Sequence, residues 1–370
     1  MSIAEAADAA QHCLDRRFAV PVFAHVPVLS GAYRNTSPLH LRQALPLNHW
    51  WLSHAIDTRL DAFHRTGDER RLHQAEATLR YLRVRNCGLF NDYFDDLGWL
   101  ALALIGLHEA TGSARRLDDA VSVWRRIRSR GWNRLEGPSV SWRVPQPGYK
   151  NAPSNGTFAL ASARLHRLTG DERYRVAADE TVQWLLDRLV TPEGVVLDGV
   201  NRTGDHRVDD GWVFSYNQGV VAAAVLERRW IPDAPATAGR IARAALPRLA
   251  PAGVVLGEEA RSDHAGGGDA GLFKGIHARY LALVAEALPA GDRDRDALVA
   301  YLDTATDALR GSFSAPAGEH AAGPVAVADV GRAGDDWSRP APPTTFLSTQ
   351  LAATMALEAR WRLDQSRTTT

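Results

Sequence analysis

A short phrase built on Thr-Gly recurs between amphipathic segments and limits the fold of this chain more than any other feature. It occurs as HRTGDERRLHQ from His64, as EATGSARRLDD from Glu109 and as RLTGDERYRVA from Arg167. Glycine adopts the left-handed conformation that ends a helix without strain, and the Asp or Ser that follows caps the next helix. The repeated unit is therefore a helical hairpin.

Helical periodicity of apolar residues continues through most of the chain. Leu97, Leu100, Leu104 and Leu107, for example, share one helix face. Six hairpins without a long linker can close into a ring of inner and outer helices. We therefore predict an all-α (α/α)6 barrel in a single domain over residues 1–370. The helices are expected near residues 3–16, 48–65, 69–84, 96–110, 114–129, 152–168, 171–190, 216–229, 235–249, 271–288, 292–310 and 345–362.

The longer connections are rich in Gly, Pro, Asp and Trp, and loops of this kind at one rim of a barrel build binding sites. Two short β-like pieces, Val195–Leu197 and Trp212–Phe214, predict a minor β-hairpin on that rim. The long connections span residues 131–151, 191–215, 250–270 and 311–344.

Charge and composition narrow the classes of partner. Basic and acidic residues number 43 each, so the formal net charge is zero. The chain lacks the overall basic field that nucleic acids or anionic membranes require, and we expect neither as a partner. Eleven tryptophans, several in polar loop contexts, suit stacking on sugars. We expect a neutral carbohydrate ligand, no cofactor and a monomeric protein.

The cysteines, the histidines and the first residues give further expectations. Cys13 and Cys87 have neither CxxC nor Cys/His spacing, so we predict two buried thiols without a disulfide or zinc site. No His/Asp cluster has ligand spacing, so no metal is expected. The start, MSIAEAADAAQHCLDRRF, lacks a continuous apolar segment and predicts neither a signal peptide nor a membrane anchor. The protein is expected to be cytoplasmic, or secreted if a leader was removed.

Two adjacent carboxylates stand out in NDYFDDLGWL, residues 91–100. An arbitrary Asp-Asp pair most often caps a helix, where it meets unpaired N–H groups and the positive helix end. Asp95 and Asp96 are instead enclosed by Tyr93, Phe94 and Trp99. Two neighbouring carboxylates in a partly apolar setting do not readily ionise together, so we expect the pair to share one proton.

Glycoside hydrolysis needs this division of protonation. An ionised carboxylate attacks or stabilises the anomeric carbon, and a protonated carboxyl group donates its proton to the leaving oxygen. Consecutive residues at a helix start can place their carboxyl groups roughly 5–6 Å apart, close to the separation found in retaining enzymes. The pair therefore predicts double displacement through a covalent glycosyl-enzyme.

With these residues in view, the chain resembles glycoside hydrolase family 76, which comprises bacterial and fungal α-1,6-mannanases with an (α/α)6 barrel. The resemblance implies a retaining hydrolase of α-1,6-mannosidic linkages in mannan or manno-oligosaccharides, with Asp95 as nucleophile and Asp96 as general acid/base. The similar phrases extend over most of the chain: HWWLSHAIDTRLDAFHRTGD (49–68), DYFDDLGWLALALIGLHEATG (92–112), YKNAPSNGTFALASARLHRLTGDERY (149–174), VVLDGV (195–200), FSYNQGVVAAA (214–224), GGDAGLFKGIHARYLALV (267–284) and LSTQLAATMAL (347–357).

The residues themselves do not rank the two aspartates. A helix N-terminus lowers the pKa of both, which suits Asp95, whereas Asp96 must be kept protonated by its charged neighbour and by burial.

Further family-like positions fall on the rim loops and helix starts. Their amide, carboxylate and ammonium groups can bind sugar hydroxyls, and their aromatic rings can cover the C–H face of a pyranose. Each also has a structural interpretation, such as helix capping for the asparagines, a turn for Asp198 or solvent exposure for Lys274. The candidates for substrate binding are Asn91, Trp142, Lys150, Asn151, Asn155, Asp198, Tyr216, Asn217, Gln218, Asp269 and Lys274.

Three features remain outside this pattern. After YNQGVVAAAVLER, the sequence RWIPDAPAT replaces the Thr-Gly turn. His277 stands where a bulky apolar residue is expected. Trp50 and Trp51 should point to different sides of one helix, so that at most one faces the hollow of the barrel.

Three other functions compete with the retaining hydrolase. A transglycosylase would use the same glycosyl-enzyme but transfer the sugar to a hydroxyl group. A sugar epimerase or unsaturated-uronide hydrolase of another (α/α)6 group would leave the Asp pair without a purpose. A non-catalytic sugar-binding barrel would bind oligosaccharides without turnover.

Overall fold

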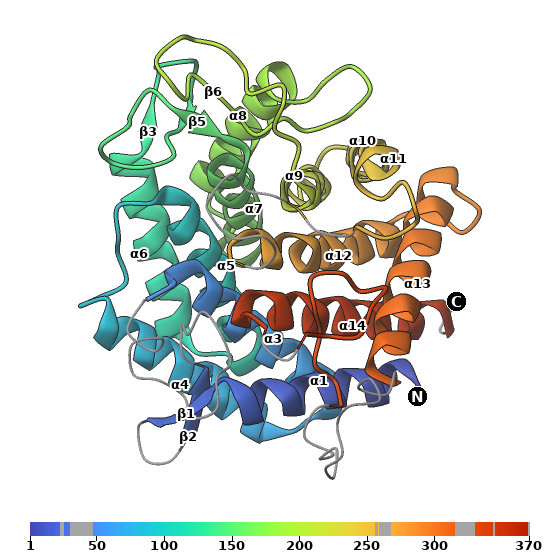
Figure 1. Ribbon diagram of the computed structural model, residues 1–370. Coiled ribbons are helices and arrows are strands. Elements are labelled where there is room, and N and C mark those ends of the chain that lie inside the picture. Colours follow the sequence, from blue (N-terminus) through green and yellow to red (C-terminus); the bar gives the residue numbers. More distant parts are fainter. Residues whose placement is uncertain are drawn as a thin grey trace. The chain divides into compact units, whose positions relative to one another are not determined.

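Figure 1 shows the computed structural model of the chain. It describes residues 1–22, 26–29, 47–255, 258, 268–314, 330–342 and 345–368. Parts of the expected long loops 250–270 and 311–344 lie outside the described residues.

Helices form nearly everywhere that the apolar periodicity predicts them. One expectation is wrong: the segment 235–249 is broken at Ala245, because Pro247 lacks an N–H and clashes with the preceding helical turn. The helices are α1 (Ile3–Arg17), α3 (His49–Thr66), α4 (Glu69–Arg85), α5 (Phe94–Thr111), α6 (Ala114–Arg130), α7 (Ala152–Thr169), α8 (Glu172–Arg188), α9 (Ser215–Leu226), α10 (Ala234–Ala244), α11 (Leu246–Leu249), α12 (Ala270–Ala287), α13 (Arg293–Ser314) and α14 (Leu347–Thr368).

The Thr-Gly phrase ends three of these helices in the same way. Gly67, Gly112 and Gly170 have φ values of 69°, 67° and 70°, in the left-handed region that favours glycine. Each donates its N–H to the carbonyl four residues earlier, at 2.7 to 2.8 Å. After the third turn, the Asp171 carboxylate accepts the N–H of Arg173 at 2.9 Å and caps α8. The hairpins α3–α4, α5–α6 and α7–α8 follow from these turns (Figure 1).

The connection from α9 to α10 departs from this pattern, as its sequence does. Trp230 anchors it: the indole N–H donates to Asp179 of α8 at 3.1 Å, and the ring meets His166 of α7 edge-on at 5.2 Å. A half-buried aromatic contact therefore replaces the glycine turn at this hairpin.

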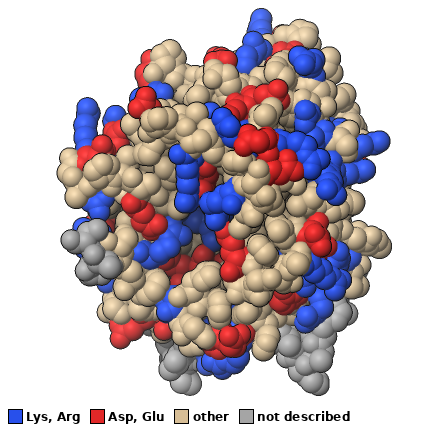
Figure 2. Space-filling view, turned by 180° about the vertical axis from the view of Figure 1, so that it is seen from behind, with Lys and Arg blue, Asp and Glu red and all other residues tan. Residues whose placement is uncertain are grey.

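The chain forms two compact units. The first unit contains Met1–Arg85, Arg248–Ala282 and Val299–Thr370, and the second contains Asn86–Pro247 and Leu283–Leu298. The expectation of one domain over residues 1–370 stays a prediction. Acidic and basic side chains are interspersed on the face in Figure 2, in keeping with the zero net charge.

Close helix contacts in each unit depend on glycine. In the second unit, a Cβ at Gly98 of α5 would lie 1.9 Å from Thr157 Oγ1 of α7. In the first unit, a Cβ at Gly275 of α12 would lie 2.3 Å from the Cα of Ala352 of α14. Any side chain at either position would push the two helices apart.

Short strands form three antiparallel pairs: β1 (Ala19–Val22) with β2 (Val26–Leu29), β3 (Trp132–Asn133) with β4 (Ser139–Val140), and β5 (Lys150–Asn151) with β6 (Gly199–Val200). The expected hairpin of Val195–Leu197 with Trp212–Phe214 is wrong. Val196 instead forms a bridge with Val190, and Gly199–Val200 pair with β5. One backbone bond joins the two predicted pieces, from the N–H of Asp198, directly after the first piece, to the Trp212 carbonyl at 3.0 Å.

The expectation of two buried thiols is wrong for Cys87. Cys13 is buried in α1, whereas Cys87 is exposed after α4 with a φ of 52°. Within the described ranges, no helix is long and apolar enough to span a bilayer.

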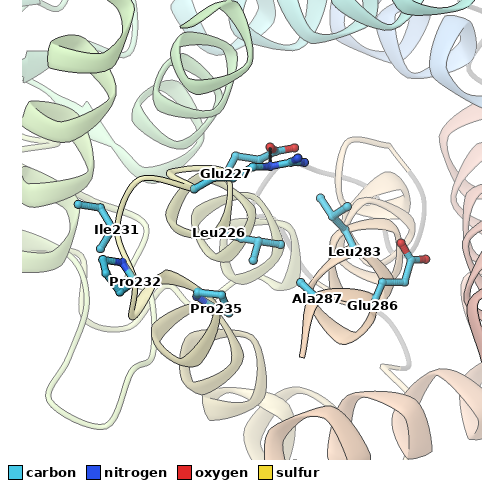
Figure 3. A pocket seen from close by; sticks show the side chains of 9 residues that line it. Leu226, Glu227, Ile231, Pro232, Pro235, Leu283, Glu286 and Ala287 are labelled. Atoms are coloured by element: carbon cyan, nitrogen blue, oxygen red, sulfur yellow. Dashed lines mark hydrogen bonds and ion pairs between the residues drawn. The ribbon is translucent and has the colours of Figure 1, made fainter. Parts of the chain in front are cut away.

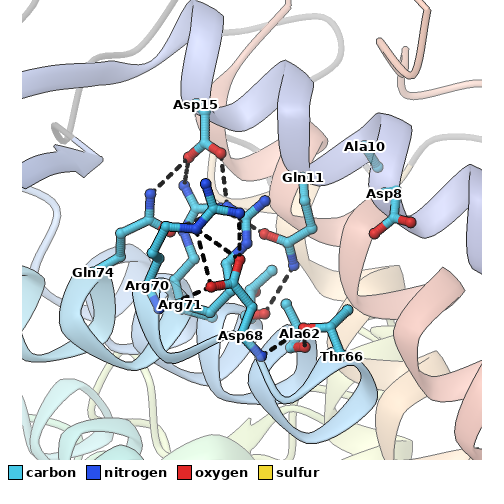
Figure 4. Close-up of polar contacts among 12 residues, drawn as sticks. Asp8, Ala10, Gln11, Asp15, Ala62, Thr66, Asp68, Arg70, Arg71 and Gln74 are labelled. Atoms are coloured by element: carbon cyan, nitrogen blue, oxygen red, sulfur yellow. Dashed lines mark hydrogen bonds and ion pairs between the residues drawn. The ribbon is translucent and has the colours of Figure 1, made fainter.

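A buried polar network fastens α1 to α3 and α4 in the first unit. Arg59 of α3 is only 1% exposed and donates to Gln11 and Asp15 of α1, each at 2.5 Å. Asp15 also accepts from Arg71 at 2.7 Å and from Gln74 at 3.3 Å, as Figure 4 shows. Burial lowers the pKa of Arg59 to about 10. The guanidinium nevertheless stays charged at neutral pH and needs its anion.

We predict that Asp15→Asn destabilises the protein by about 2–4 kcal/mol, because it leaves the buried Arg59 charge without its anion. Denaturant unfolding measures the change. Asp68→Asn is the matched control: it weakens the exposed ion pair with Arg70 at 2.8 Å and should cost less than about 1 kcal/mol. Equal losses in the two variants would contradict the role of the network.

Candidate active site

Both adjacent carboxylates lie in the first turn of α5, in the second unit. The N-cap of α5 is Tyr93, whose backbone is extended, and Phe94 starts the helix by donating its N–H to the Trp142 carbonyl at 2.8 Å. Neither Asp95 nor Asp96 occupies the cap position, so helix capping does not explain the pair. Both side chains are half-buried.

Each carboxylate has different hydrogen-bond donors. Asp95 accepts the Trp142 indole N–H at Oδ2 and the Asp96 backbone N–H at Oδ1, both at 3.1 Å. Asp96 Oδ2 accepts the side-chain amide of Asn91 at 2.6 Å. The structure therefore brings two of the expected site residues, Asn91 and Trp142, to the Asp pair.

Burial raises the pKa of Asp95 to about 7, and the charge of Asp198 raises it further. The N–H donors from Asp96 and Trp142 oppose this rise. The N–H groups at the helix N-terminus thus lower the pKa of Asp95 as expected, but loss of hydration outweighs them and the net shift is upward. A carboxyl group with this pKa holds a proton in weakly acidic solution.

Trp142 is packed by protein groups on several sides. The Arg143 guanidinium carbon lies 4.4 Å from the centroid of its ring. Tyr93 and Tyr149 meet the ring edge-on, with centroids 5.5 and 5.6 Å away. Trp142 therefore acts on the site through its hydrogen bond to Asp95, which orients that carboxylate.

Lys150 is fully buried, and its ammonium faces a loop of the protein. Its ammonium donates to the carbonyls of Asn133, Gly137 and Ser139 at 3.0, 3.2 and 2.6 Å. Burial lowers the pKa of Lys150 to about 7. All three ammonium hydrogens have acceptors in the loop between α6 and β4, so Lys150 holds that loop in shape.

The side chains of three expected amide residues form hydrogen bonds with backbone groups of the protein. Asn151 accepts the Ser154 N–H at 3.3 Å and caps α7, as its structural interpretation predicts. Asn155 bonds both backbone groups of Val140, at 2.8 and 2.9 Å. Gln218 of α9 repeats this pattern on Val196, with both bonds at 2.8 Å.

Asp198 is the centre of a second acidic cluster. It is buried and accepts from Asn217 at 2.8 Å, from the Tyr149 hydroxyl at 3.0 Å and from Arg202 at 2.5 Å. Burial raises the pKa of Asp198, and Arg202 most strongly opposes the rise. Arg202 also pairs with Asp209 at 2.9 Å.

Sequence reasoning missed Tyr149, Arg202 and Asp209. The guanidinium of Arg202 stacks on Trp212, 3.9 Å from its ring centroid. These residues lie in a turn-rich segment with no periodicity to relate them. The one signal was a cluster of four acids and two arginines in residues 198–210. Tyr216, which was expected, is half-buried in the first turn of α9, near Phe214.

The first unit holds the two remaining candidates, at and near the start of α12. Asp269 accepts the indole N–H of Trp50 at 3.2 Å and of Trp51 at 2.9 Å, and burial raises its pKa. The two indole N–H groups thus converge on one oxygen, although Trp51 is fully buried and Trp50 is only half-buried.

Lys274 is buried rather than solvated, with its ammonium 4.7 Å from the ring centroid of Trp337. Burial lowers its pKa to about 8. His277 is also buried, beside Tyr301, and burial lowers its pKa to about 3. His277 is thus a neutral residue of the core. It occupies a buried position, as expected for a site where the sequence context predicts a bulky apolar side chain.

A pocket of about 400 Å³ lies at the far end of α9, roughly 15 Å along the helix from Tyr216. Figure 3 shows its largely apolar lining from α9, the Trp230 connection, α10 and α12. None of the expected site residues contributes to it. The lining residues are Leu226, Glu227, Arg229, Ile231, Pro232, Pro235, Leu283, Glu286 and Ala287. In the part of the chain that the structure describes, no three His, Cys, Asp or Glu side chains are grouped as metal ligands.

We predict that Lys150→Met destabilises the protein by about 2–4 kcal/mol, because three buried carbonyls lose their donor. Amide hydrogen exchange should accelerate first in residues 133–141. Arg188→Met is the control, since it removes an exposed ion pair with Glu136 of the same loop at 3.2 Å and should cost less than about 1 kcal/mol. Unchanged exchange in Lys150→Met would show that the ammonium does not hold the loop.

Solved structures share this fold over nearly the whole chain. The crystal structure of the Lin0763 protein from Listeria innocua has a TM-score of 0.86 at 30% identity and covers 99% of this chain and 98% of that one. The α-1,6-mannanase GH76A of Salegentibacter sp. HEL1_6 has a TM-score of 0.82 at 26% identity and covers 98% and 100%. The expected fold class, an all-α (α/α)6 barrel, is confirmed.

Sequence comparison leads to the same family. Mannan endo-1,6-alpha-mannosidase DCW1 of Saccharomyces cerevisiae is 27% identical over 180 residues, which cover 47% of this chain and 39% of that protein. The chain spans less than half of the length of the curated relatives that it matches. Residues 26–323 match the family described as Glycosyl hydrolase family 76. The helical hairpins, the paired carboxylates at the start of α5 and this match together place the chain in glycosyl hydrolase family 76.

Proposed function

We propose that the protein is a retaining glycoside hydrolase that cleaves α-1,6-mannosidic linkages in mannan or manno-oligosaccharides. The observation that carries the proposal is the pair of adjacent, half-buried carboxyl groups in the first turn of α5. Their different donors allow the two groups to take different protonation states, which glycoside hydrolysis requires.

In the first step, Asp95 attacks the anomeric carbon while Asp96 donates its proton to the glycosidic oxygen. The bond from carbon to the leaving oxygen breaks, and a mannosyl ester of Asp95 forms. In the second step, Asp96 accepts a proton from water, the water oxygen attacks the same carbon, and Asp95 leaves as a carboxylate. Two inversions return the α configuration.

The hydrogen bonds favour this assignment of roles. Two N–H donors, from Trp142 and from the Asp96 backbone, point at Asp95 and stabilise its ionised form when the proton lies on Asp96. Asn91 donates its side-chain N–H to Oδ2 of Asp96 and so orients that carboxyl group. We propose that Asn91 and Trp142 position the pair and that Tyr216 contacts the sugar.

The relatives support the substrate class. The Salegentibacter α-1,6-mannanase has been solved in complex with α-1,6-mannotriose and α-1,6-mannotetraose, in variants that are inactive after replacement of two consecutive aspartates. DCW1 is a mannan endo-1,6-alpha-mannosidase by name. The monomeric state and the cytoplasmic location stay predictions.

Product analysis tests the proposal. We predict that the protein degrades linear α-1,6-mannan and α-1,6-mannotetraose, and that NMR detects the α-anomer as the first product. Asp95→Asn should lower kcat by at least about a thousandfold while oligosaccharide binding is kept. A β-anomer as first product would exclude retention. Binding without turnover by the unchanged protein would favour a sugar-binding barrel, and larger products in the presence of an acceptor would reveal transglycosylation.

The pKa of Asp95 predicts how activity depends on pH. The mechanism needs one proton on the pair. In the resting protein this proton is held at Asp95 with a pKa of about 7. It must lie on Asp96 when the sugar reacts, and the pair loses it in alkaline solution. We predict that kcat/KM for α-1,6-mannotetraose falls roughly tenfold per pH unit above about pH 7. Activity that stays constant up to pH 9 would contradict this titration.

Unfolding provides a check that does not depend on turnover. The ordinary pKa of Asp is 3.8, so between that pH and about 7 the folded protein holds a proton that the unfolded chain lacks, and stability falls as pH rises. Asp95→Asn removes the buried charge. It should therefore be more stable than the unchanged protein at pH 8, by on the order of 2 kcal/mol, and equally stable near pH 4.

A further inference from the structure

The C-terminal part of α6 carries an unusual concentration of positive charge. Residues 125–134, RRIRSRGWNR, include five arginines and no acid, in a chain with a net charge of zero. They occupy the last turns of α6 and the start of the next loop, within the second unit. We call these five residues the arginine row: Arg125, Arg126, Arg128, Arg130 and Arg134.

Within the described ranges, no member of the row forms an ion pair with a carboxylate. Arg126 instead lies over the ring of Phe90 and Arg128 over the ring of Trp132, at 5.7 and 4.3 Å from the centroids. The Nε of Arg126 is buried without a hydrogen-bond partner. By contrast, α8 of the next hairpin pairs its arginines with carboxylates, as in the 3.1 Å contact of Arg175.

Helix stability does not explain the row. Basic residues in the last turn of a helix meet its negative end favourably, which accounts for Arg128 and Arg130. Arg125 and Arg126 lie before that turn, and Arg134 lies beyond the helix. Like charges three and four residues apart also repel each other along a helix. An anion bound to these arginines would relieve the repulsion between them.

The end of α6 that carries the row packs against the start of α5, which carries the Asp pair. Gly131, directly after the row's last helical residue, is packed so closely on Phe94 that a Cβ there would lie 3.0 Å from its ring. Phe94 immediately precedes Asp95. Phe90, which lies under Arg126, belongs to the same approach to α5.

Arg143 continues the positive charge beside the pair. It stacks on Trp142, the residue that hydrogen-bonds Asp95. Its hydrogen bonds go to neutral acceptors only, the Gln146 side chain at 3.3 Å and the Tyr93 hydroxyl at 3.4 Å. Like the row, it forms no ion pair with a described carboxylate, although the site is rich in acids.

We propose that the arginine row and Arg143 bind phosphate groups carried by the same glycan that reaches the Asp pair. The proposal rests on the proposed function and narrows its substrate to a phosphate-bearing α-1,6-mannan. Guanidinium groups keep their charge at all relevant pH values and bind phosphate oxygens in a bidentate manner. Because the end of α6 packs on the start of α5, a glycan bound at the Asp pair lies beside the row, which favours a glycan over a nucleic acid or a membrane.

The experiment compares α-1,6-mannotetraose with the same tetrasaccharide bearing one phosphate monoester. The test variant is R125Q/R130Q/R134Q, which changes the three exposed arginines of the row. The control variant, R70Q/R173Q/R339Q, removes the same charge from exposed arginines elsewhere. We expect the unchanged protein to prefer the phosphorylated substrate about tenfold in kcat/KM at low salt, and less at high salt.

The row variant should lose this preference, whereas its kcat/KM for the neutral tetrasaccharide should change less than about threefold. The control should keep the preference. A preference that is absent from the unchanged protein, persists in the row variant or is lost equally in the control would overturn the proposal.

Binding separates failure of this proposal from failure of the proposed function. If neither tetrasaccharide is hydrolysed, the proposed function fails. Calorimetry with both tetrasaccharides then still measures the phosphate preference of each variant. Row-dependent binding of single-stranded DNA or of phosphatidylglycerol vesicles that is tighter than binding of the phosphorylated tetrasaccharide would overturn the assignment to a glycan.

Discussion

The buried ammonium of Lys150 is the interaction on which the rest of the candidate site depends. Its three bonds to loop carbonyls offset the cost of burying a cation and fix the loop that ends at β4. The neighbouring residues extend this constraint, since Tyr149 reaches Asp198 and Asn151 caps α7. The segment that precedes them places Trp142 against Asp95. Three consecutive residues, Tyr149 and the two residues of β5, thus hold three elements in a single arrangement.

Electrostatics at the candidate site depend on two acids that lose hydration, the half-buried Asp95 and the buried Asp198. Asp95 and Asp198 both lose hydration, which raises both pKa values, and the charge of Asp198 adds to the effect on Asp95. Arg202 is bonded to Asp198 and to Asp209 and so limits the rise at Asp198. Among the residues that the structure describes, no cation is paired with Asp95 in this way. The proton affinity of the Asp pair is therefore high where catalysis requires a proton, and the cluster around Asp198 helps to keep it there.

The sequence predicted those parts of the molecule that depend on local rules. Thr-Gly turns and apolar periodicity gave the helices to within a few residues, and the Asp pair with Asn91 and Trp142 followed from a short stretch and a family resemblance. The role of Lys150 was not predictable from spacing, because its acceptors are backbone carbonyls that any sequence possesses. One signal was available: only two of the 43 basic residues are lysines, and both are buried. In a chain that uses arginine for its surface cations, a lysine marks a position that needs a compact ammonium.

In the second unit, the two ends of the buried helices have different roles: one end forms the tight turns, and the other carries the site residues. The C-terminal ends of α5 and α7 close with glycine turns that are nearly identical in conformation and carry no site residues. Their N-terminal ends, with that of α9, carry the Asp pair, Asn151, Tyr216 and Asn217, and long loops connect them. A turn of fixed geometry sets helix spacing, so it tolerates little variation, whereas loops held by side-chain contacts can change without moving the helices. Chemistry at one end can therefore diversify, as the arginines flanking the start of α5 illustrate, while the glycine turns preserve the fold.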